Sequence, residues 1–284
     1  MWQPPGSEYV SWSTRYNPTM SPPSPVPTAA AHARVNGIEM YYEIHGGGGG
    51  PSLVLLHGGG STIEVSWSRI LPFLARHRRV IALEEQGHGR TSDRDAPVRF
   101  DTSADDVAGL LDHLDMARAD LLGFSNGASV ALQVAIRHPT RVRKLVFASS
   151  FTNRAGAHNQ LWEFMARADF SSMPQPLKDA FLKVNPDQAK LKVMHDKDAA
   201  RMRNFPDVAD DDLRGLQASS LVLAGDRDIV RLEHLLELIR LIPQSRLAIL
   251  PAGHGDYLGE AVASQGESSY PELTAGLIEQ FLVA

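Results

Sequence analysis

"DLLGFSNGASVALQVAIRH", residues 120–138, places a serine between a short apolar segment and an apolar helical pattern. Residues 120–125 are typical of a strand, and residues 126–138 of a central helix that is apolar on nearly all sides. Gly123, Ser125 and Gly127 form the pattern G-x-S-x-G, which suits a sharp strand-to-helix turn because only small residues fit beside its centre. We therefore expect the Ser125 hydroxyl to be exposed where the strand ends, as a candidate nucleophile.

The segments around this turn alternate between strand-like and helix-like patterns. Continuous apolar runs predict further buried strands at residues 52–56, 80–83, 144–149, 220–225 and 246–253. Apolar residues at helical spacing lie between these runs, and an Asn-Gly pair at 36–37 predicts a turn between two early strands. This alternation predicts an α/β fold with a doubly wound, mostly parallel sheet of about eight strands.

Composition divides the 284 residues into four parts. Residues 1–32 are rich in proline and serine and predict a poorly ordered leader, without the basic flank and apolar stretch of a secretory signal. Residues 151–218 contain helical patterns but no strand-like run, and five of the six lysines of the chain lie there. We interpret them as a helical lid, or cap, inserted between the two parts of the core, residues 33–150 and 219–284.

Charge and cysteine content exclude several classes of function. The chain has no cysteine, which excludes disulfides, iron–sulfur clusters, thiolate zinc sites and a cysteine nucleophile. The net charge is −5 and no basic tract follows a helix face, so we expect no nucleic-acid partner. No apolar run reaches the roughly 18–20 residues of a membrane span. We expect a cytoplasmic protein, and the sequence leaves its oligomeric state open.

Two glycine runs follow histidines and have different interpretations. Residues 46–50 precede an apolar strand, whereas phosphate-binding loops follow one, so we interpret this run as a flexible hairpin turn and His45 as a surface residue. Gly58, Gly59 and Gly60 do follow a strand. Their backbone can approach a ligand without side-chain obstruction at the edge where α/β folds bind ligands.

A serine nucleophile needs a base and an orienting acid on neighbouring loops. His254 lies just after the last predicted strand, and Asp226 and Asp228 follow the strand before it. Serine, acid and histidine is the chain order expected for such a triad in this architecture. We prefer Asp228 as the acid because the chain has left the strand there, and we expect Asp226 to cap the following turn.

Together these segments resemble the α/β-hydrolase superfamily, in its serine-nucleophile, esterase-like branch. The resemblance covers the chain from about Val35 onward and includes "LLHGGGST", "EEQGHGRTSD", "GFSNGAS", "AGDRD" and "GHGD". The turn that carries Ser125 matches the nucleophile elbow of this superfamily and is called the elbow below. One departure is Ala128, where many relatives have a second glycine after the elbow. Serine at the elbow argues against dehalogenase and epoxide hydrolase activities, because those relatives use aspartate there.

The resemblance implies a role for each matching position. Ser125 would be the nucleophile, His254 the base and then the acid, and Asp228 the orienting carboxylate. The backbone N–H groups of Asn126 and Gly59 would form the oxyanion hole, with Gly60 as the alternative second donor. His88 matches a family motif, and we interpret it as structural.

The function that follows is hydrolysis of a small-molecule carboxylic ester, lactones included, without cofactor or metal. Carbon–carbon bond hydrolysis of diketone-type substrates, acyl transfer and a ligand receptor on the same fold remain alternatives. An aminopeptidase is disfavoured because no acidic cluster in the lid is evident to bind an amine. The large apolar residues of the lid either line the substrate pocket or hold the lid together: Phe151, Trp162, Phe164, Met165, Phe170, Met173, Phe181 and Met202.

Overall fold

The computed structural model describes residues 26–263, 266 and 268–284. The first described strand, β1 (Ala29–Val35), pairs antiparallel with β2 (Ile38–His45) across its whole length. Asn36 and Gly37 form the predicted turn, with φ angles of 44° and 85°. The expected leader therefore ends before Ala29, and its boundary at residue 32 is wrong because residues 29–32 belong to the sheet. The rest of the leader prediction, residues 1–25, lies outside the described residues.

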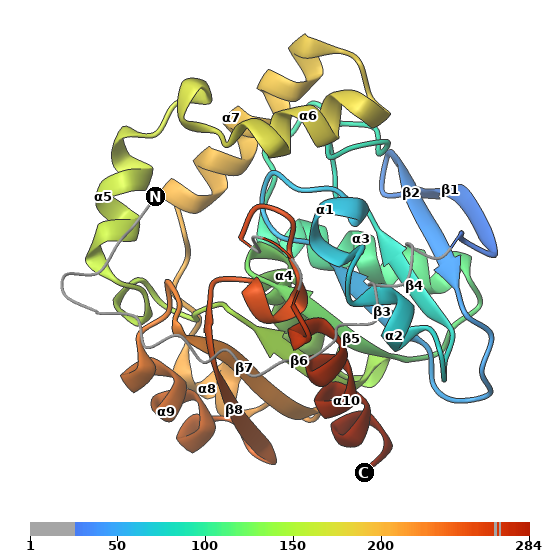
Figure 1. The fold of residues 1–284 in the computed structure, drawn as a ribbon, viewed down its shortest axis with the longest axis vertical. Coiled ribbons are helices and arrows are strands. Elements are labelled where there is room, and N and C mark those ends of the chain that lie inside the picture. The colour runs from blue at the N-terminus through green and yellow to red at the C-terminus, as the bar shows by residue number, and fades with distance from the viewer. Residues whose placement is uncertain (1–25, 264–265, 267) are drawn as a thin grey trace.

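One sheet of eight strands runs through the molecule in the order β1-β2-β4-β3-β5-β6-β7-β8 (Figure 1). The first two strands are antiparallel to their neighbours, and the strands from β4 to β8 are parallel. This confirms the predicted fold class. The bounds of these strands are β3 (Leu53–Leu56), β4 (Val80–Leu83), β5 (Ala119–Phe124), β6 (Val142–Ala148), β7 (Ser219–Arg227) and β8 (Ser245–Gly253).

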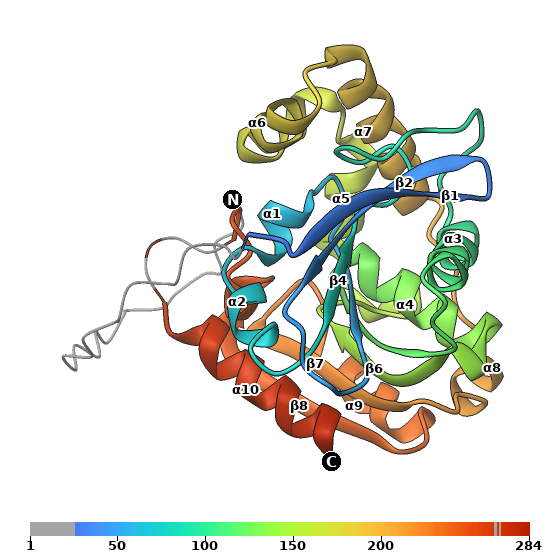
Figure 2. The same cartoon turned by 90° about the vertical axis from the view of Figure 1, so that its right-hand side faces the viewer.

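Helices cover both faces of the sheet, which is seen nearly edge-on in Figure 2. One face packs against α3 (Phe100–His113), α4 (Asn126–Arg137) and α9 (Leu232–Leu241). The other face packs against α1 (Ile63–Trp67), α2 (Leu71–Leu74) and α10 (Tyr270–Val283). No helix in the described ranges is long and apolar enough to cross a membrane.

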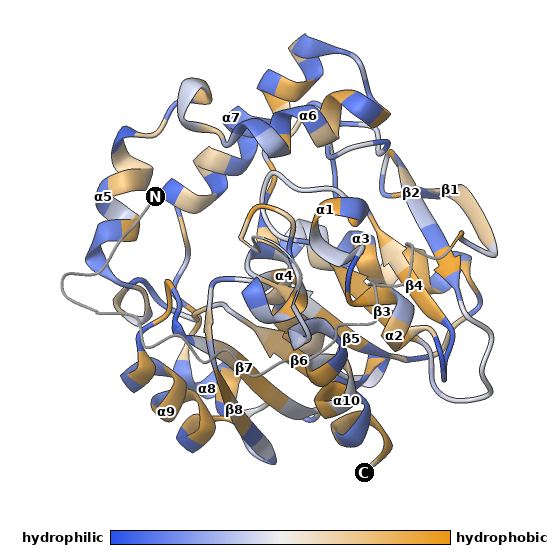
Figure 3. Ribbon diagram, viewed as in Figure 1, coloured by the Kyte–Doolittle hydropathy of each residue, from blue (hydrophilic) through white to orange (hydrophobic). Residues whose placement is uncertain are grey.

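The central strands are apolar along their length because they are buried on both faces (Figure 3). In β3, Val54 and Leu56 pack into the core beneath α3 and α4, whereas Leu53 and Leu55 pack into the core on the other face. All four side chains are completely buried. This double burial explains why a run of consecutive apolar residues, rather than an alternating pattern, marked the strand.

Between β6 and β7 the chain leaves the sheet and forms helices. Three of them, α5 (Asn159–Arg167), α6 (Gln175–Val184) and α7 (Gln188–Arg203), are called the cap helices below. They lie together at one end of the molecule (Figures 1 and 2). A fourth helix, α8 (Asp210–Arg214), lies beside α9 and leads back to the sheet.

The glycine run at residues 46–50 is not a hairpin turn. It connects β2 to β3, and these strands are not neighbours because β4 lies between them. A side chain at Gly46 would meet the carbonyl oxygens of Ala75 and Arg78 at 2.4 Å, so the run passes tightly against the loop that enters β4. His45 is only 2% exposed, contrary to the expected surface position, and its Nε2 lies 2.9 Å from the carboxylate of Glu43.

Candidate active site

The turn between β5 and α4 forces an unusual backbone conformation on Ser125. Its φ and ψ angles are 54° and −120°, a region that side-chain-bearing residues rarely adopt. A Cβ atom at Gly123 would lie 2.2 Å from the Gly127 oxygen, and one at Gly127 would lie 2.1 Å from the Leu56 oxygen. Only glycine fits at both positions, so the local sequence explains the sharp turn.

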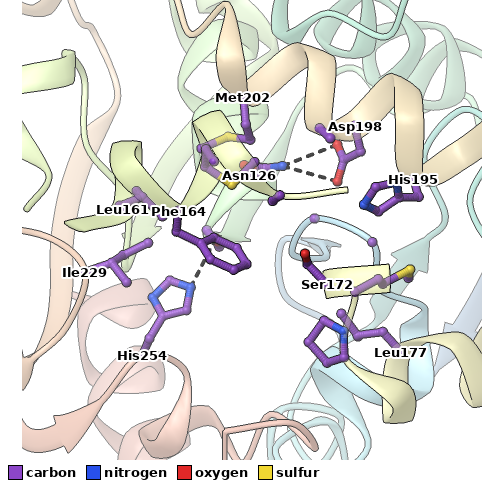
Figure 4. A pocket seen from close by; sticks show the side chains of 18 residues that line it. Asn126, Leu161, Phe164, Ser172, Leu177, His195, Asp198, Met202, Ile229 and His254 are labelled. Atoms are coloured by element: carbon purple, nitrogen blue, oxygen red, sulfur yellow. Dashed lines mark hydrogen bonds between the residues drawn. The ribbon is translucent and has the colours of Figure 1, made fainter. Parts of the chain in front are cut away.

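The three loops that follow β5, β7 and β8 bring a hydroxyl, a carboxylate and an imidazole together. Nε2 of His254 lies 3.2 Å from Oγ of Ser125. Nδ1 of His254 lies 2.7 Å from Oδ1 of Asp228. Figure 4 shows His254 among the side chains that line a cavity, with its ring directed away from its own loop. The residues expected to act as nucleophile, base and acid are thus connected by hydrogen bonds.

The two candidate acids, Asp228 and Asp226, accept hydrogen bonds from different backbone N–H groups. Asp228 accepts hydrogen bonds from the N–H of Ile229 at 2.7 Å and of Gly225 at 3.2 Å, which fix its carboxylate beside His254. Asp226 instead accepts from the N–H of Ala252 at 2.9 Å, linking β7 to β8. It does not cap the following turn as expected, because it still lies within β7 and faces the neighbouring strand.

A residue that sequence analysis overlooked also holds Asp228. Oγ of Ser149, at the end of β6, donates to Oδ2 of Asp228 and accepts from the hydroxyl of Tyr257 at 2.6 Å. Ser149 has a φ of 52°, so its backbone is held in a sparsely populated conformation at this point. Its position at the end of a predicted strand was the available signal.

His254 and Asp228 shift each other's pKa. Burial alone would lower the pKa of His254, but the charge and hydrogen bond of Asp228 outweigh burial and raise it above the ordinary 6.5. Burial alone would raise the pKa of Asp228. The charge and hydrogen bond of His254, with help from Ser149, outweigh burial and lower it. Asp228 therefore stays ionised, and His254 binds a proton more readily than a free imidazole.

The backbone next to Ser125 offers two candidate hydrogen-bond donors. Within the described part of the chain, the N–H groups of Gly59 and Asn126 have no hydrogen-bond partner. The two residues are adjacent in space, because a Cβ atom at Gly59 would lie 2.5 Å from Nδ2 of Asn126. Gly60, the alternative donor, has a φ of 65° and lines the same cavity. This arrangement suits two donors directed at one oxygen.

A cavity of about 280 Å³ lies between these loops and the cap helices. Ser125 and His254 line its floor, and most of its wall is apolar (Figure 4). Four of the eight large apolar residues singled out in the sequence line it, and the other four pack elsewhere in the cap or core. The four that line it are Phe164, Met165, Met173 and Met202.

One carboxylate interrupts the apolar wall, and sequence analysis missed it. Asp198 of α7 lines the cavity, and Nδ2 of Asn126 donates to its Oδ1 at 3.3 Å. The sequence analysis considered only an acidic cluster in the lid and did not single out this one aspartate. The helical spacing of residues 151–218 was too weak to show which face of α7 meets the core. His88 is buried and does not contact Ser125, but its Nε2 lies 3.8 Å from Oδ2 of Asp198.

Among the described residues, no group of three or more histidine, aspartate or glutamate side chains is arranged to hold a metal ion. The chemistry that the site offers on its own is that of a hydroxyl, an imidazole, a carboxylate and two backbone N–H groups. Such a set can form and resolve an acyl-serine.

A parallel sheet of this order, with a strained serine elbow and with histidine and aspartate on later strand exits, defines a class of fold and site shared by many hydrolases. Comparison with known proteins agrees. The profile of the α/β hydrolase fold matches residues 51–210. The chain belongs to the α/β-hydrolase fold family.

Three similar proteins illustrate the range of this family. Over 243 residues the chain is 33% identical to a dihydrolipoyllysine-residue acetyltransferase component of an acetoin cleaving system from Pseudomonas putida, covering 80% of this chain but only 64% of that protein. It is 30% identical over 230 residues to a 2-hydroxy-6-oxo-2,4-heptadienoate hydrolase from Pseudomonas putida, covering 72% and 83%. A solved hydrolase structure from Pseudomonas aeruginosa superimposes with a TM-score of 0.70 at 25% identity, covering 90% and 99%.

Proposed function

We propose that this protein is a serine hydrolase that cleaves a small-molecule carboxylic ester, lactones included, through an acyl-Ser125 intermediate. The observation that carries the proposal is the hydrogen-bonded chain from Ser125 through His254 to Asp228 at the floor of a largely apolar cavity. A hydrogen-bond network that only stabilises the fold does not need an adjoining cavity. Its presence supports a bound substrate rather than a purely structural network.

The mechanism follows from these contacts. Oγ of Ser125 attacks the ester carbonyl carbon while its proton moves to Nε2 of His254. The N–H groups of Gly59 and Asn126 hold the resulting oxyanion, and removing one such donor typically costs about 3–4 kcal/mol of barrier. His254 then gives the proton to the departing alcohol. Next it takes one from water, which attacks the acyl carbon. As the bond from that carbon to Oγ of Ser125 breaks, His254 returns the proton to Oγ, and the carboxylic acid is released.

The wall of the cavity favours a neutral ester over the alternative of carbon–carbon bond hydrolysis. Similarity to a heptadienoate hydrolase supports that alternative, and a dienoate carries a carboxylate. A buried carboxylate needs a cationic partner. Within the described residues, the cavity lining contains neither lysine nor arginine. Arg201, the buried guanidinium nearby, is already bonded to the carboxylates of Asp198 and Glu85.

The test is a panel of p-nitrophenyl esters of increasing acyl chain length, with wild type and Ser125→Ala. We expect wild type to hydrolyse short and medium chains and Ser125→Ala to lower kcat by about 10³-fold or more. Ser129→Ala is the matched control. It removes a buried hydroxyl from α4, four residues after Ser125, but that hydroxyl is bonded to Ser150 at 2.9 Å rather than to His254.

Two results would contradict the proposal. Undiminished turnover by Ser125→Ala would show that another group is the nucleophile. Turnover of a vinylogous dienoic acid by wild type, with no activity on any ester of the panel, would identify carbon–carbon bond hydrolysis instead.

A further inference from the structure

Among the described residues that line the apolar cavity there is one aspartate, Asp198, which comes from α7. Nδ2 of Asn126 lies 3.3 Å from its Oδ1 and 3.5 Å from its Oδ2, so it sits directly beside a proposed oxyanion-hole residue. A Cβ atom at Gly59 would lie 2.6 Å from Oδ2. Figure 4 shows the side chains of Asp198 and Asn126 directed toward each other, with His195 beside Asp198. A substrate held by this hole therefore lies close to the carboxylate.

Asp198 keeps its charge. Burial alone would raise the pKa of its carboxyl, but the charge of Arg201, one helical turn further along α7, and the nearby His88 hold it well below its usual range. The side chain of Asp198 is only 10% exposed. At any pH at which a serine hydrolase works, this group is a carboxylate.

Arg201 does not fully balance that charge. The Arg201 guanidinium is buried between two carboxylates, since NH1 donates to Oε2 of Glu85 at 2.8 Å and NH2 donates to Asp198. One positive charge thus faces two negative charges. His88 adds a second positive charge when it is protonated. Burial alone would lower its pKa, but Asp198 and Glu85 outweigh burial and raise it above the ordinary 6.5, so the cluster carries a net negative charge above the pKa of His88. Its Nε2 is buried without a hydrogen-bond partner among the described residues, 3.8 Å from Asp198.

The two oxygens of Asp198 differ in their surroundings. Oδ1 accepts from Arg201 and Asn126. Oδ2 has only the long 3.5 Å contact with Asn126 and the 3.8 Å approach of His88. It lies on the side of Gly59, which itself lines the cavity. Oδ2 therefore has capacity to accept a hydrogen bond from a substrate.

We propose that Asp198 is a specificity residue that selects substrates by charge at the site. It disfavours esters that carry a second, anionic group near the reacting carbonyl, and it favours neutral esters and those that present a cation or a hydrogen-bond donor. This inference rests on the proposed function, because it assumes that the cavity holds the substrate of Ser125. It adds a substrate class to that function.

The experiment compares three p-nitrophenyl esters with acyl chains of similar length, ending in a methyl, a carboxylate and a trimethylammonium group. In wild type we expect kcat/KM for the anionic ester to be at least about tenfold below that for the neutral ester. Asp198→Asn should raise the anionic-to-neutral ratio by about tenfold and lower the cationic-to-neutral ratio. The variant leaves Arg201 paired with Glu85 alone, which is a balanced ion pair.

The matched control is Asp179→Asn, which removes one negative charge from an exposed position on α6 outside the cavity. It should leave both ratios unchanged. If Asp198→Asn does not fold, Asp198→Ser removes the same charge with a smaller side chain. The wild-type ratio alone also tests the idea, because equal rates for the anionic and neutral esters would overturn it.

Binding separates the failure of this inference from the failure of the proposed function. Calorimetric affinities of 4-phenylbutanol, 4-phenylbutyrate and 4-phenylbutylammonium need no catalysis. If no ester is hydrolysed, preference for the alcohol and the ammonium over the carboxylate, reduced in Asp198→Asn, still supports charge selection. If Ser125→Ala abolishes hydrolysis but Asp198→Asn changes neither rate ratios nor relative affinities, only the charge selection is wrong.

Discussion

His254 lies between Asp228 and Ser125, and its protonation state decides whether the serine can be activated. Only the neutral imidazole accepts the serine proton. Because Asp228 raises the pKa of His254, less than half of the imidazole is neutral at pH 6.5. We predict that kcat/KM on a neutral ester falls as the pH is lowered, with a midpoint above pH 6.5. A pH–rate profile between pH 5 and 9 measures this midpoint.

Asp228→Asn provides the control for that assignment. Without the carboxylate charge the pKa of His254 should fall, so the acid limb should move to lower pH while the rate drops by about 10³–10⁴-fold. Equal activity at pH 4 and pH 8 in wild type would rule out His254 as the base. So would an acid limb that stays in place when Asp228 is replaced.

At the scale of single residues, the sequence predicted the positions that lie at strand exits. Ser125, His254 and Asp228 each follow an apolar strand, and parallel strands end at one edge of a sheet, so the contact between them could be expected. Asp198 could not be found in this way because it lies on a cap helix, whose placement depends on packing rather than on strand order. Ser149 was at a strand exit, but a serine there carries no recognisable pattern.

At the scale of secondary-structure elements, the packing of α4 against β3 depends on Gly127. A Cβ atom there would lie 2.1 Å from the Leu56 oxygen and 2.5 Å from the His57 oxygen. We predict that Gly127→Ala displaces α4, lowers the free energy of unfolding by about 1–3 kcal/mol and reduces kcat, because the displaced helix begins one residue after Ser125. Denaturant unfolding and ester hydrolysis measure the two effects.

Gly276 of α10 is the matched control. Nothing lies within 4 Å of a Cβ atom placed there, so Gly276→Ala should raise the free energy of unfolding by up to about 1 kcal/mol through helix propensity, with kcat unchanged. Equal effects of the two substitutions would mean that α4 tolerates the added methyl group and that the close approach is not required.

Local patterns predicted elements better than the connections between them. The turn at Asn36 and Gly37 was predictable because both residues readily adopt positive φ. The run at Gly46–Gly50 was misinterpreted because glycines also occur where two backbone segments pass closely, and only the strand order separates these meanings. His45 was misplaced for the same reason, since its burial follows from the position of β2 inside the sheet.

At the scale of the whole molecule, the site and a second ionic cluster lie at opposite edges of the sheet. The site follows the carboxyl ends of β5, β7 and β8. At the other edge Arg78, just before β4, donates to both carboxylate oxygens of Glu279 at 2.6 and 2.7 Å and to Asp120 at 3.3 Å. Asp120 also pairs with Arg143. This cluster fastens the C-terminal helix α10 to the sheet, which neither strand patterns nor motifs in the sequence predicted.

Arg78 therefore tests whether fold stability and catalysis are separable. Its side chain is 5% exposed, so Arg78→Met leaves the Glu279 carboxylate without its bidentate partner in a largely buried setting and should lower the free energy of unfolding by about 3–5 kcal/mol. Arg34→Met, which removes an arginine 90% exposed and paired with Glu39, should cost less than about 1 kcal/mol.

Well below the melting temperature both variants should keep wild-type kcat, because neither residue contacts the loops that carry Ser125, Asp228 and His254. Chemical denaturation and steady-state kinetics at 20 °C give the two readouts. A loss of kcat in folded Arg78→Met would mean that the anchoring of α10 is transmitted through the sheet to the opposite edge.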